Sequence, residues 1–211
     1  MGSKALKKGL LLNPGMARGE LLPFVLLALL AILTLPPCLP QAGAEVVIVD
    51  LHMDIDAGAE ELVRRAISRV RAKPGDVGAV VLELDTYGGW AHIMDKIIGM
   101  ISDCPATTVA FVPEGGNCFS AGAYIFMACD VTAMAPGTAV GSCMPVDALG
   151  NPADEKTVNA MAAKMRALAE AHGRNATAAE AMVFNADYTA EEALRLGVCD
   201  MVVSDLDELL S

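Results

Sequence analysis

Two apolar segments of this sequence each run into a pair of glycines, and this feature constrains the fold more than any other. Residues 77–84 are mostly apolar and lead to the glycine pair 88–89, while residues 107–112 lead through the pair 115–116 to Ser120. Long apolar runs are typical of strands that are buried on both faces of a parallel sheet. Glycine turns at the ends of such strands can present backbone N–H groups beside a serine hydroxyl, an arrangement that acyl transfer requires.

The rest of the chain alternates between strand and helix patterns, which predicts an α/β fold built of parallel βαβ units with right-handed crossovers. Asp56 is expected to cap the first helix, and Asn151 followed by Pro152 is expected to begin the longest one. Residues 113–117 and 136–150 are expected to be loops. The expected strands are 46–51, 77–84, 107–112, 131–135 and 198–203, and the helices after the first are 91–102, 120–128, 151–172, 176–184 and 189–196.

The charge of the chain excludes one class of partner. The 211 residues have a formal net charge of −11. Residues 1–44 hold four basic side chains against one acidic one, a net of +3, which leaves −14 on residues 45–211. Nucleic-acid binding needs a basic face, so an acidic body of this kind excludes it. We expect one soluble, globular domain at 45–211 behind a basic leader at 1–44.

The leader has the three parts of an export signal. Basic residues precede Leu21–Leu35, which is largely apolar over 15 residues, and the small-residue site Ala42-Gly43-Ala44 follows. A spanning helix needs about 20 apolar residues, so the length favours a cleaved signal peptide and leaves an uncleaved anchor as the alternative. In either case the body is expected outside the cytoplasm, secreted or associated with the membrane.

The six cysteines do not have metal-binding spacing. None of them forms a Cys-x-x-Cys pair, so zinc ligation is not expected. Five of them follow the leader, an odd number, so in an oxidising compartment at least one is expected to be free or to pair between chains. The sequence leaves the pairing open.

Several motifs, in a fixed order, are similar to those of the NfeD-type membrane-associated serine proteases, which belong to the ClpP/crotonase fold group. The resemblance covers roughly residues 46–209 and implies a ClpP/crotonase-like spiral of βαβ units. It also implies a peptide-bond hydrolase with a Ser–Lys dyad, from a family whose substrates are linked to stomatin-like membrane proteins, without cofactor or metal. The motifs are Asp85-Thr86-x-Gly88-Gly89, Ser120-Ala121-Gly122, Met134-Ala135-Pro136-Gly137-Thr138, Gly141, Lys156 and Gly173-Arg174-Asn175.

The resemblance makes Ser120 the nucleophile and Lys156 the general base. Ser120 could instead be a helix cap, the commoner role of a serine at that position. A lysine accepts a proton only when uncharged, and packing on an alanine-lined helix face together with the helix dipole would favour that form of Lys156. A solvated surface lysine is the alternative interpretation.

The three histidines are weaker candidates for the base. His92 follows the glycine turn and could approach the site, so it stays an alternative. His172 is expected to be a buried core residue, and His52 a structural one. The oxyanion donors are expected to be the N–H groups of Gly89 and Ala121, with Gly88 as a further candidate.

Two departures from the family pattern leave other functions open. The first departure is Tyr87, which stands where the family usually has proline and affects the turn at 88–89. The second is that longer members of the family continue into membrane helices and a small β-barrel. A non-catalytic scaffold that binds stomatin-like proteins is therefore one alternative, and an acyl-CoA enzyme on the same fold is another. Trp90 lines a substrate groove or packs against the body. By analogy with fold relatives, a homo-oligomer is expected.

Overall fold

The computed structural model describes residues 45–147 and 149–211. The predicted leader lies outside the described residues, so its interpretation as a signal peptide or anchor stays a prediction. No helix in the described ranges has both the length and the apolar character that crossing a membrane would require.

The elements are β1 (Glu45–Leu51), α2 (Ala57–Ala72), β2 (Val77–Leu84), α3 (Ala91–Ser102), β3 (Thr107–Val112), β4 (Asn117–Phe119), α4 (Ala121–Ala128), β5 (Val131–Met134), β6 (Ala139–Gly141), α5 (Glu155–Ala171), α6 (Ala176–Val183), β7 (Asp187–Thr189), α7 (Ala190–Leu196), β8 (Met201–Val202) and α8 (Leu206–Leu209).

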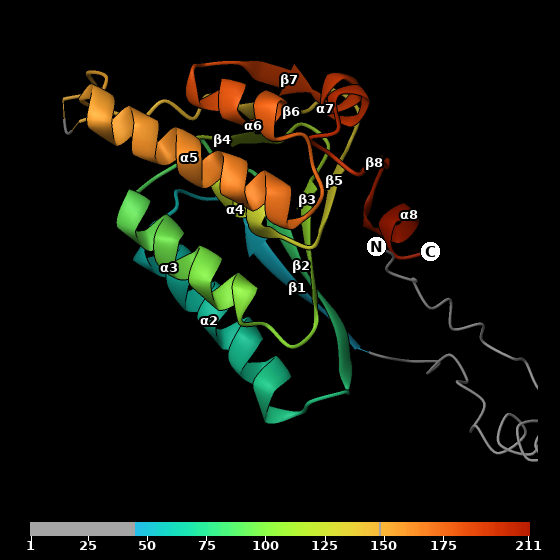
Figure 1. Cartoon of the computed structure of the whole chain (residues 1–211). Coiled ribbons are helices and arrows are strands. Elements are labelled where there is room, and N and C mark those ends of the chain that lie inside the picture. Colours follow the sequence, from blue (N-terminus) through green and yellow to red (C-terminus); the bar gives the residue numbers. More distant parts are fainter. Residues whose placement is uncertain (1–44, 148) are drawn as a thin grey trace, which may run out of the picture. The chain divides into compact units, whose positions relative to one another are not determined.

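The main sheet is parallel throughout, as the alternating pattern predicts. In the described residues its strand order is β1-β2-β3-β5-β8, and every neighbouring pair runs in the same direction (Figure 1). The predicted segments 77–84, 91–102 and 107–112 have the predicted bounds, and Asp56 caps α2 by accepting from the N–H groups of Gly58 and Ala59. The α/β class is confirmed.

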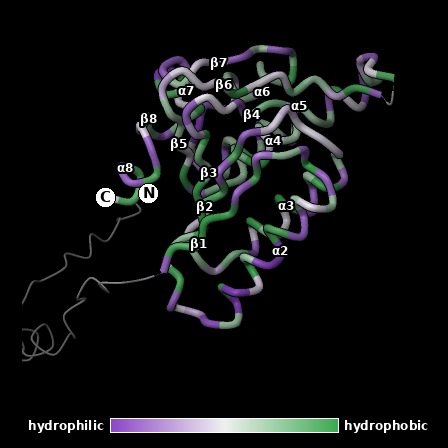
Figure 2. The backbone as a smooth tube through the Cα atoms, turned by 180° about the vertical axis from the view of Figure 1, so that it is seen from behind, coloured by the Kyte–Doolittle hydropathy of each residue, from purple (hydrophilic) through white to green (hydrophobic). Residues whose placement is uncertain are grey.

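The two faces of this sheet are covered differently. Helices α2, α3 and α4 lie over one face, while the short helix α8 lies by the opposite one (Figure 1). The larger core lies under the first three helices, and a smaller cluster around Val81 and Phe111 packs against Leu206 and Leu209 of α8. Figure 2 shows β1 and β2 as mainly hydrophobic, whereas α2 alternates between the two colours. Strands covered on both faces need such continuous apolar runs.

The sequence interpretation was wrong about three short strands. In the described residues β4, β6 and β7 form a second sheet, with β4 parallel to β6 and β6 antiparallel to β7. The predicted loop 136–150 contains β6, and β4 begins at the end of the predicted loop 113–117. Each of these strands has three residues, too short for a two-residue period to show. β4 matters for function because it ends directly before Ser120.

The predicted start of the longest helix was also wrong. α5 begins at Glu155, after the N-cap Asp154, whose carboxylate accepts from the N–H of Thr157 at 3.1 Å. Asn151 instead belongs to a tight loop, because the Asp147 carboxylate accepts from its backbone N–H at 2.9 Å. Pro152 forms a bridge with Val146 across that loop. The Asn-Pro pair therefore closes a turn rather than starting the helix.

A buried arginine anchors the helix that follows Ser120. The Arg174 side chain is 2% exposed, and its Nη2 donates to Oδ2 of Asp200 at 2.7 Å. The guanidinium also donates to backbone carbonyls at the end of α4, where a cation complements the helix dipole. These carbonyls are those of Met127, Cys129 and Asp130.

Replacing Arg174 with methionine is expected to lower the free energy of unfolding by about 3–5 kcal/mol, because three backbone carbonyls and the partly exposed Asp200 carboxylate lose their donor. Urea denaturation measures this. The matched control is Arg65→Met, since Arg65 is 72% exposed where it pairs with Glu61 on the surface, and it should cost less than about 1 kcal/mol. Equal losses in both variants would contradict the anchoring role.

The same ion pair makes stability depend on pH. Desolvation acts to raise the pKa of Asp200, but the hydrogen bonds from Arg174 and from the N–H of Thr132 outweigh it and hold that pKa below its ordinary value. A lowered folded-state pKa stabilises the fold above the unfolded value of about 3.9, and this stabilisation is lost as the pH falls through the folded value. The stability difference between wild type and Arg174→Met is therefore expected to shrink below about pH 4.

Candidate active site

Ser120 lies at the junction of β4 and α4 in a backbone conformation that L-residues rarely adopt, with φ 53° and ψ −121°. Its N–H donates to the carbonyl of Gly141 at 3.0 Å, and its own carbonyl accepts from Ala123 at 3.1 Å. The side chain makes no cap hydrogen bond to the helix. The capping role is therefore not observed, and the hydroxyl stands at a strained turn of the kind that concentrates at functional sites.

Gly88 lies against this serine. A β-carbon at position 88 would be 2.6 Å from Cβ and 2.9 Å from Oγ of Ser120, closer than non-bonded atoms approach. The backbone there also has φ 118°, which disfavours any side chain. Only glycine allows the turn after β2 to come this close to the hydroxyl.

Gly89 is required by a close contact with the backbone of Ile55. A β-carbon at this position would lie 2.3 Å from the carbonyl oxygen of Ile55. The turn is joined to Ile55 on both sides: the Ile55 N–H donates to the Gly88 carbonyl at 2.8 Å, and the Trp90 N–H donates to the Ile55 carbonyl at 2.9 Å. Glycine at 89 thus lets the turn pack against the segment before α2.

The three expected oxyanion donors differ in availability. The Gly88 N–H donates to Oγ1 of Thr86 at 3.1 Å and is already used. Among the described residues, no acceptor takes the N–H of Gly89 or that of Ala121. Both residues line the same hollow as Ser120. The structure therefore offers two free amides beside the hydroxyl, from two separate segments.

The hollow beside Ser120 has a volume of about 640 Å³ and is mostly apolar. Trp90 lines it and is 64% exposed, so this residue does not simply pack against the body. The sequence interpretation missed most of the remaining lining, because these side chains come from core-facing positions and from an aperiodic loop. Tyr124 carried a usable signal, since it lies one helical turn after Ser120 and so on the same face of α4. The missed lining residues are Met94, Tyr124, residues 143–147 and Met161.

Buried groups in the wall of the hollow are held uncharged. Desolvation, reinforced by the nearby Cys143, raises the pKa of the Tyr124 hydroxyl, which donates weakly to the Met161 carbonyl at 3.5 Å. Desolvation also raises the pKa of Cys143, with Asp187 adding to the effect. None of the five cysteines in the described residues is bonded to another. The part of the wall at Tyr124 and Cys143 is therefore neutral, whereas Asp147 adds a carboxylate whose pKa is lowered by hydrogen bonds from Asn151.

Lys156 does not contact Ser120 in this structure. It is exposed in the first turn of α5 and is not among the residues that line the hollow. Within the described residues, its amine has no hydrogen-bond or ion-pair partner. The packed alanine-lined environment that the sequence led us to expect is absent, because the face of α5 that carries Lys156 is exposed to solvent, its alanines Ala160, Ala163 and Ala167 included.

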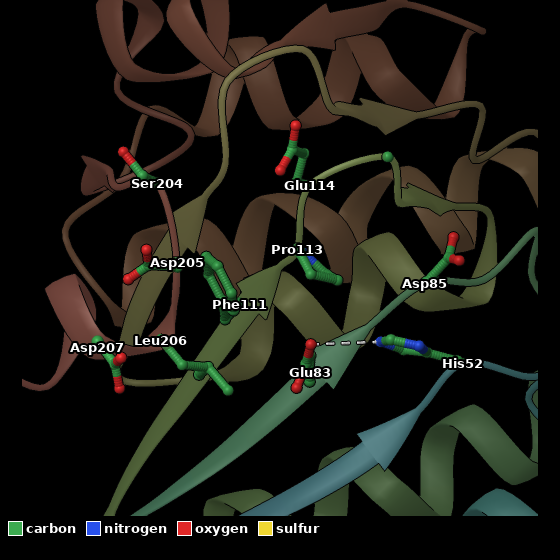
Figure 3. A pocket seen from close by; sticks show the side chains of 11 residues that line it. His52, Glu83, Asp85, Phe111, Pro113, Glu114, Ser204, Asp205, Leu206 and Asp207 are labelled. Atoms are coloured by element: carbon green, nitrogen blue, oxygen red, sulfur yellow. Dashed lines mark ion pairs between the residues drawn. The ribbon is translucent and has the colours of Figure 1, made fainter.

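The histidines occupy three unrelated places. His92 lines the same hollow as Ser120, and its ring centroid is 6.1 Å from that of Trp90. His172 lies partly buried with Nδ1 3.9 Å from Asp130, rather than fully in the core. His52 lies in a separate acidic hollow, with Nε2 3.5 Å from Glu83 (Figure 3). In the described residues, no group of three or more His, Cys, Asp or Glu side chains could hold a metal ion.

Tyr87 does not disrupt the glycine turn. Its side chain is 75% exposed, and its ring centroid lies 6.0 Å from that of Phe119, the residue before Ser120. The contacts of Gly88 and Gly89 described above form with tyrosine at this position. Tyr87 therefore adds an exposed aromatic ring to the surface beside the site.

The parallel sheet, its helical layer and the serine at a strand–helix junction define a ClpP-like α/β domain. ClpP1 from Listeria monocytogenes shares the fold, with a TM-score of 0.61 and 20% identity over 78% of this chain and 94% of that chain. At that identity the likeness concerns the fold alone. Residues 45–211 match the family described as NfeD1b, N-terminal domain, and the chain belongs to this family.

Two curated relatives carry names that refer to membranes. The membrane-bound protease PH1510 from Pyrococcus horikoshii is 37% identical over 146 residues, which are 66% of this chain and 33% of that protein. The membrane protein NfeD1b from Bacillus subtilis is 29% identical over 178 residues, which are 83% of this chain and 38% of that protein. The chain therefore spans about a third of the length of these relatives.

Solved structures of a stomatin-specific protease also match most of the chain. A lysine-to-alanine mutant of the 1510-N membrane-bound stomatin-specific protease, in complex with a substrate peptide, has a TM-score of 0.74 and 32% identity, covering 80% of each chain. A serine-to-alanine mutant of 1510-N has a TM-score of 0.75 and 33% identity, covering 80% of this chain and 84% of that chain.

Proposed function

We propose that residues 45–211 form a serine endopeptidase domain that cleaves peptide bonds through an acyl-enzyme on Ser120. One observation carries the proposal: the Ser120 hydroxyl stands at a strained turn without a capping role, beside the free N–H groups of Gly89 and Ala121. That set supplies a nucleophile and two oxyanion donors. The homologous protease, studied as serine and lysine mutants, supports the assignment.

In the proposed reaction, Oγ of Ser120 attacks the scissile carbonyl carbon while Lys156 takes its proton. The carbonyl oxygen becomes an oxyanion, which accepts hydrogen bonds from the N–H groups of Gly89 and Ala121. The C–N bond then breaks, and Lys156 returns the proton to the leaving amine. Water then attacks the carbonyl carbon of the ester on Ser120 and gives a proton to the same lysine. The C–Oγ bond breaks, the lysine returns that proton to Oγ of Ser120, and the new carboxyl end is released.

This mechanism requires Lys156 to move. Proton transfer needs its Nζ within about 2.6–3.2 Å of Oγ, directly or through one water, and hydrogen bonds of this kind often form only in the substrate complex. The loop at 143–147 lines the hollow and leads into the first turn of α5. A peptide bound in the hollow would contact this loop, so substrate binding is the event that we expect to bring the lysine in.

We propose membrane-protein segments as the substrate class. The hollow is lined by Trp90, Met94, Met144, Val146 and Met161, which suits extended apolar peptides. The stomatin-specific relatives make stomatin-like proteins the first candidates. With residues 1–44 as an export signal or anchor, the domain would act outside the cytoplasm at or near the membrane, and a homo-oligomer stays a prediction.

A fluorophosphonate probe tests the proposal directly. The probe is expected to label the wild-type protein once, and mass spectrometry of the digest should place the label on Ser120. An excess of an apolar peptide should slow the labelling. Ser102→Ala is the control, because Ser102 lies at the end of α3 with its hydroxyl bonded to the Ile98 carbonyl, and this variant should label normally.

The exposed position of Lys156 favours one competing function, a non-catalytic scaffold that binds stomatin-like proteins. A scaffold would not label with the probe and would not cleave peptides, yet would still bind an apolar peptide in the hollow. Binding of the peptide without labelling or cleavage would therefore contradict the protease function and support the scaffold function.

A further inference from the structure

Thr86 is a buried polar residue, 2% exposed, between the end of β2 and the glycine turn. Its backbone joins this segment to β4: its N–H donates to the Asn117 carbonyl at 2.7 Å, and its carbonyl accepts from Phe119 at 3.0 Å. β4 leads straight into Ser120. Thr86 is thus tied, through its main chain, to the strand that carries the nucleophile.

The Thr86 hydroxyl holds the glycine turn from inside. It accepts from the Gly88 N–H at 3.1 Å and lies 3.3 Å from the Gly88 carbonyl, to which it donates. The N–H of Ile55 donates to the same carbonyl. A trans peptide unit is planar, with its C=O and N–H pointing in opposite directions. Two donors that hold the Gly88 carbonyl therefore also fix the direction of the Gly89 N–H, which points away from them.

The Thr86 methyl group contacts the other amide source. A β-carbon on Gly122 would lie 2.4 Å from Cγ2 of Thr86, so the methyl group packs where that side chain would be. Gly122 belongs to the first turn of α4, directly after Ala121, the second free amide. One side chain therefore touches both segments that supply the free N–H groups.

We propose that Thr86 is a positioning residue that sets the two oxyanion donors relative to each other. Its hydroxyl occupies the Gly88 N–H and aims the Gly89 N–H, and its methyl group sets how closely α4, with Ala121, approaches the turn. This inference rests on the proposed function, since it assigns a role within that catalytic site. Threonine combines a hydroxyl and a methyl group on one β-carbon, which neither serine nor valine does.

Substitutions at Thr86 separate the two parts of the side chain. Thr86→Val keeps the shape and loses both hydrogen bonds, so kcat for peptide hydrolysis is expected to fall about 10-fold to 100-fold with KM changed less than about threefold, as expected for misplaced groups that act in the transition state. Thr86→Ser keeps the hydroxyl and should retain kcat within about threefold to fivefold of wild type.

Thr138→Val is the matched control. Thr138 is also buried, at 1% exposure, and its hydroxyl donates to the Ala135 carbonyl at 2.6 Å. This variant loses a comparable buried hydrogen bond and should show a similar fall in melting temperature, but kcat should not change. Wild-type kcat in Thr86→Val, or an equal loss of kcat in both valine variants, would overturn the positioning role.

The Gly88 amide gives a second readout that does not depend on activity. Hydrogen exchange followed by NMR should show this amide protected in wild type and in Thr86→Ser, and faster in Thr86→Val. Unchanged protection in Thr86→Val would also overturn the proposal. If the wild-type protein hydrolysed no peptide and took no probe, the proposed protease would fail, and the Gly88 amide would still decide whether Thr86 holds the turn.

Discussion

Alanine at either Ser120 or Lys156 is expected to lower kcat for the hydrolysis of an apolar peptide by about 10⁴-fold to 10⁶-fold, and the double variant should be no slower than the worse single one. The reason is that a hydroxyl without a base is a weak nucleophile, and a base without its nucleophile has no proton to take. Rates on a fluorogenic peptide, measured for the four proteins under the same conditions, check both statements.

Lys164→Ala and His92→Ala complete this experiment. Lys164 lies on the same helix as Lys156 but is ion-paired with Asp95, so its loss should leave kcat within about threefold of wild type. His92 lines the hollow and is the competing base. A large loss in His92→Ala with normal rates in Lys156→Ala would transfer the base to the histidine. Normal rates in Ser120→Ala would remove the acyl-enzyme mechanism altogether.

Gly88→Ala is expected to reduce kcat more than about 100-fold and to destabilise the fold by about 2–4 kcal/mol, because it combines overpacking with a strained backbone. The added carbon would lie 2.6 Å from Cβ and 2.9 Å from Oγ of Ser120. The turn or the start of α4 must shift to relieve this contact, and the free amides move with them. Peptide kinetics and urea denaturation measure the two effects.

Gly137→Ala is the control that separates backbone strain from the contact. Gly137 has φ 79°, but a β-carbon there would meet nothing within 4 Å. The Gly137→Ala variant should lose about 1–2 kcal/mol of unfolding free energy, because alanine is strained in the left-handed conformation, and its kcat should be unchanged. If Gly88→Ala kept wild-type kcat, or cost no more stability than Gly137→Ala, the close approach of the turn to Ser120 would not matter for catalysis.

The accuracy of the sequence interpretation followed the length and apolar character of each element. The strands at 77–84 and 107–112 and the helix at 91–102 have the predicted bounds, since a buried strand or an amphipathic helix must show its burial in its own residues. β4, β6 and β7 pair through their backbones over three residues each and leave no such pattern. The start of α5 was misplaced because Asp147 binds the N–H of Asn151 within a loop, and Asp154 rather than Asn151 accepts an N–H of the first helical turn.

The candidate site divides in the same way. Ser120 and the glycine pair could be chosen from the sequence, because a hydroxyl at a helix start and glycines at a strand end are visible in order along the chain. The use of Thr86 could not be foreseen, since a threonine after a strand has many possible partners. The exposure of Lys156 was not foreseen either, because it depends on where a folded loop lets α5 begin.

The amino-acid sequence by itself determined the alternation of strands and helices, the parallel sheet and the short set of residues that could carry acyl transfer. The tertiary structure alone decided which amides are free, since the Gly88 N–H is taken by Thr86 while those of Gly89 and Ala121 are not. The physical reason is that a periodic pattern of apolar residues reflects which positions are buried, and burial shows in the type of each single residue. The direction of an N–H group depends on contacts between segments, such as that between Gly88 and Ile55, and these contacts exist only once the chain is folded.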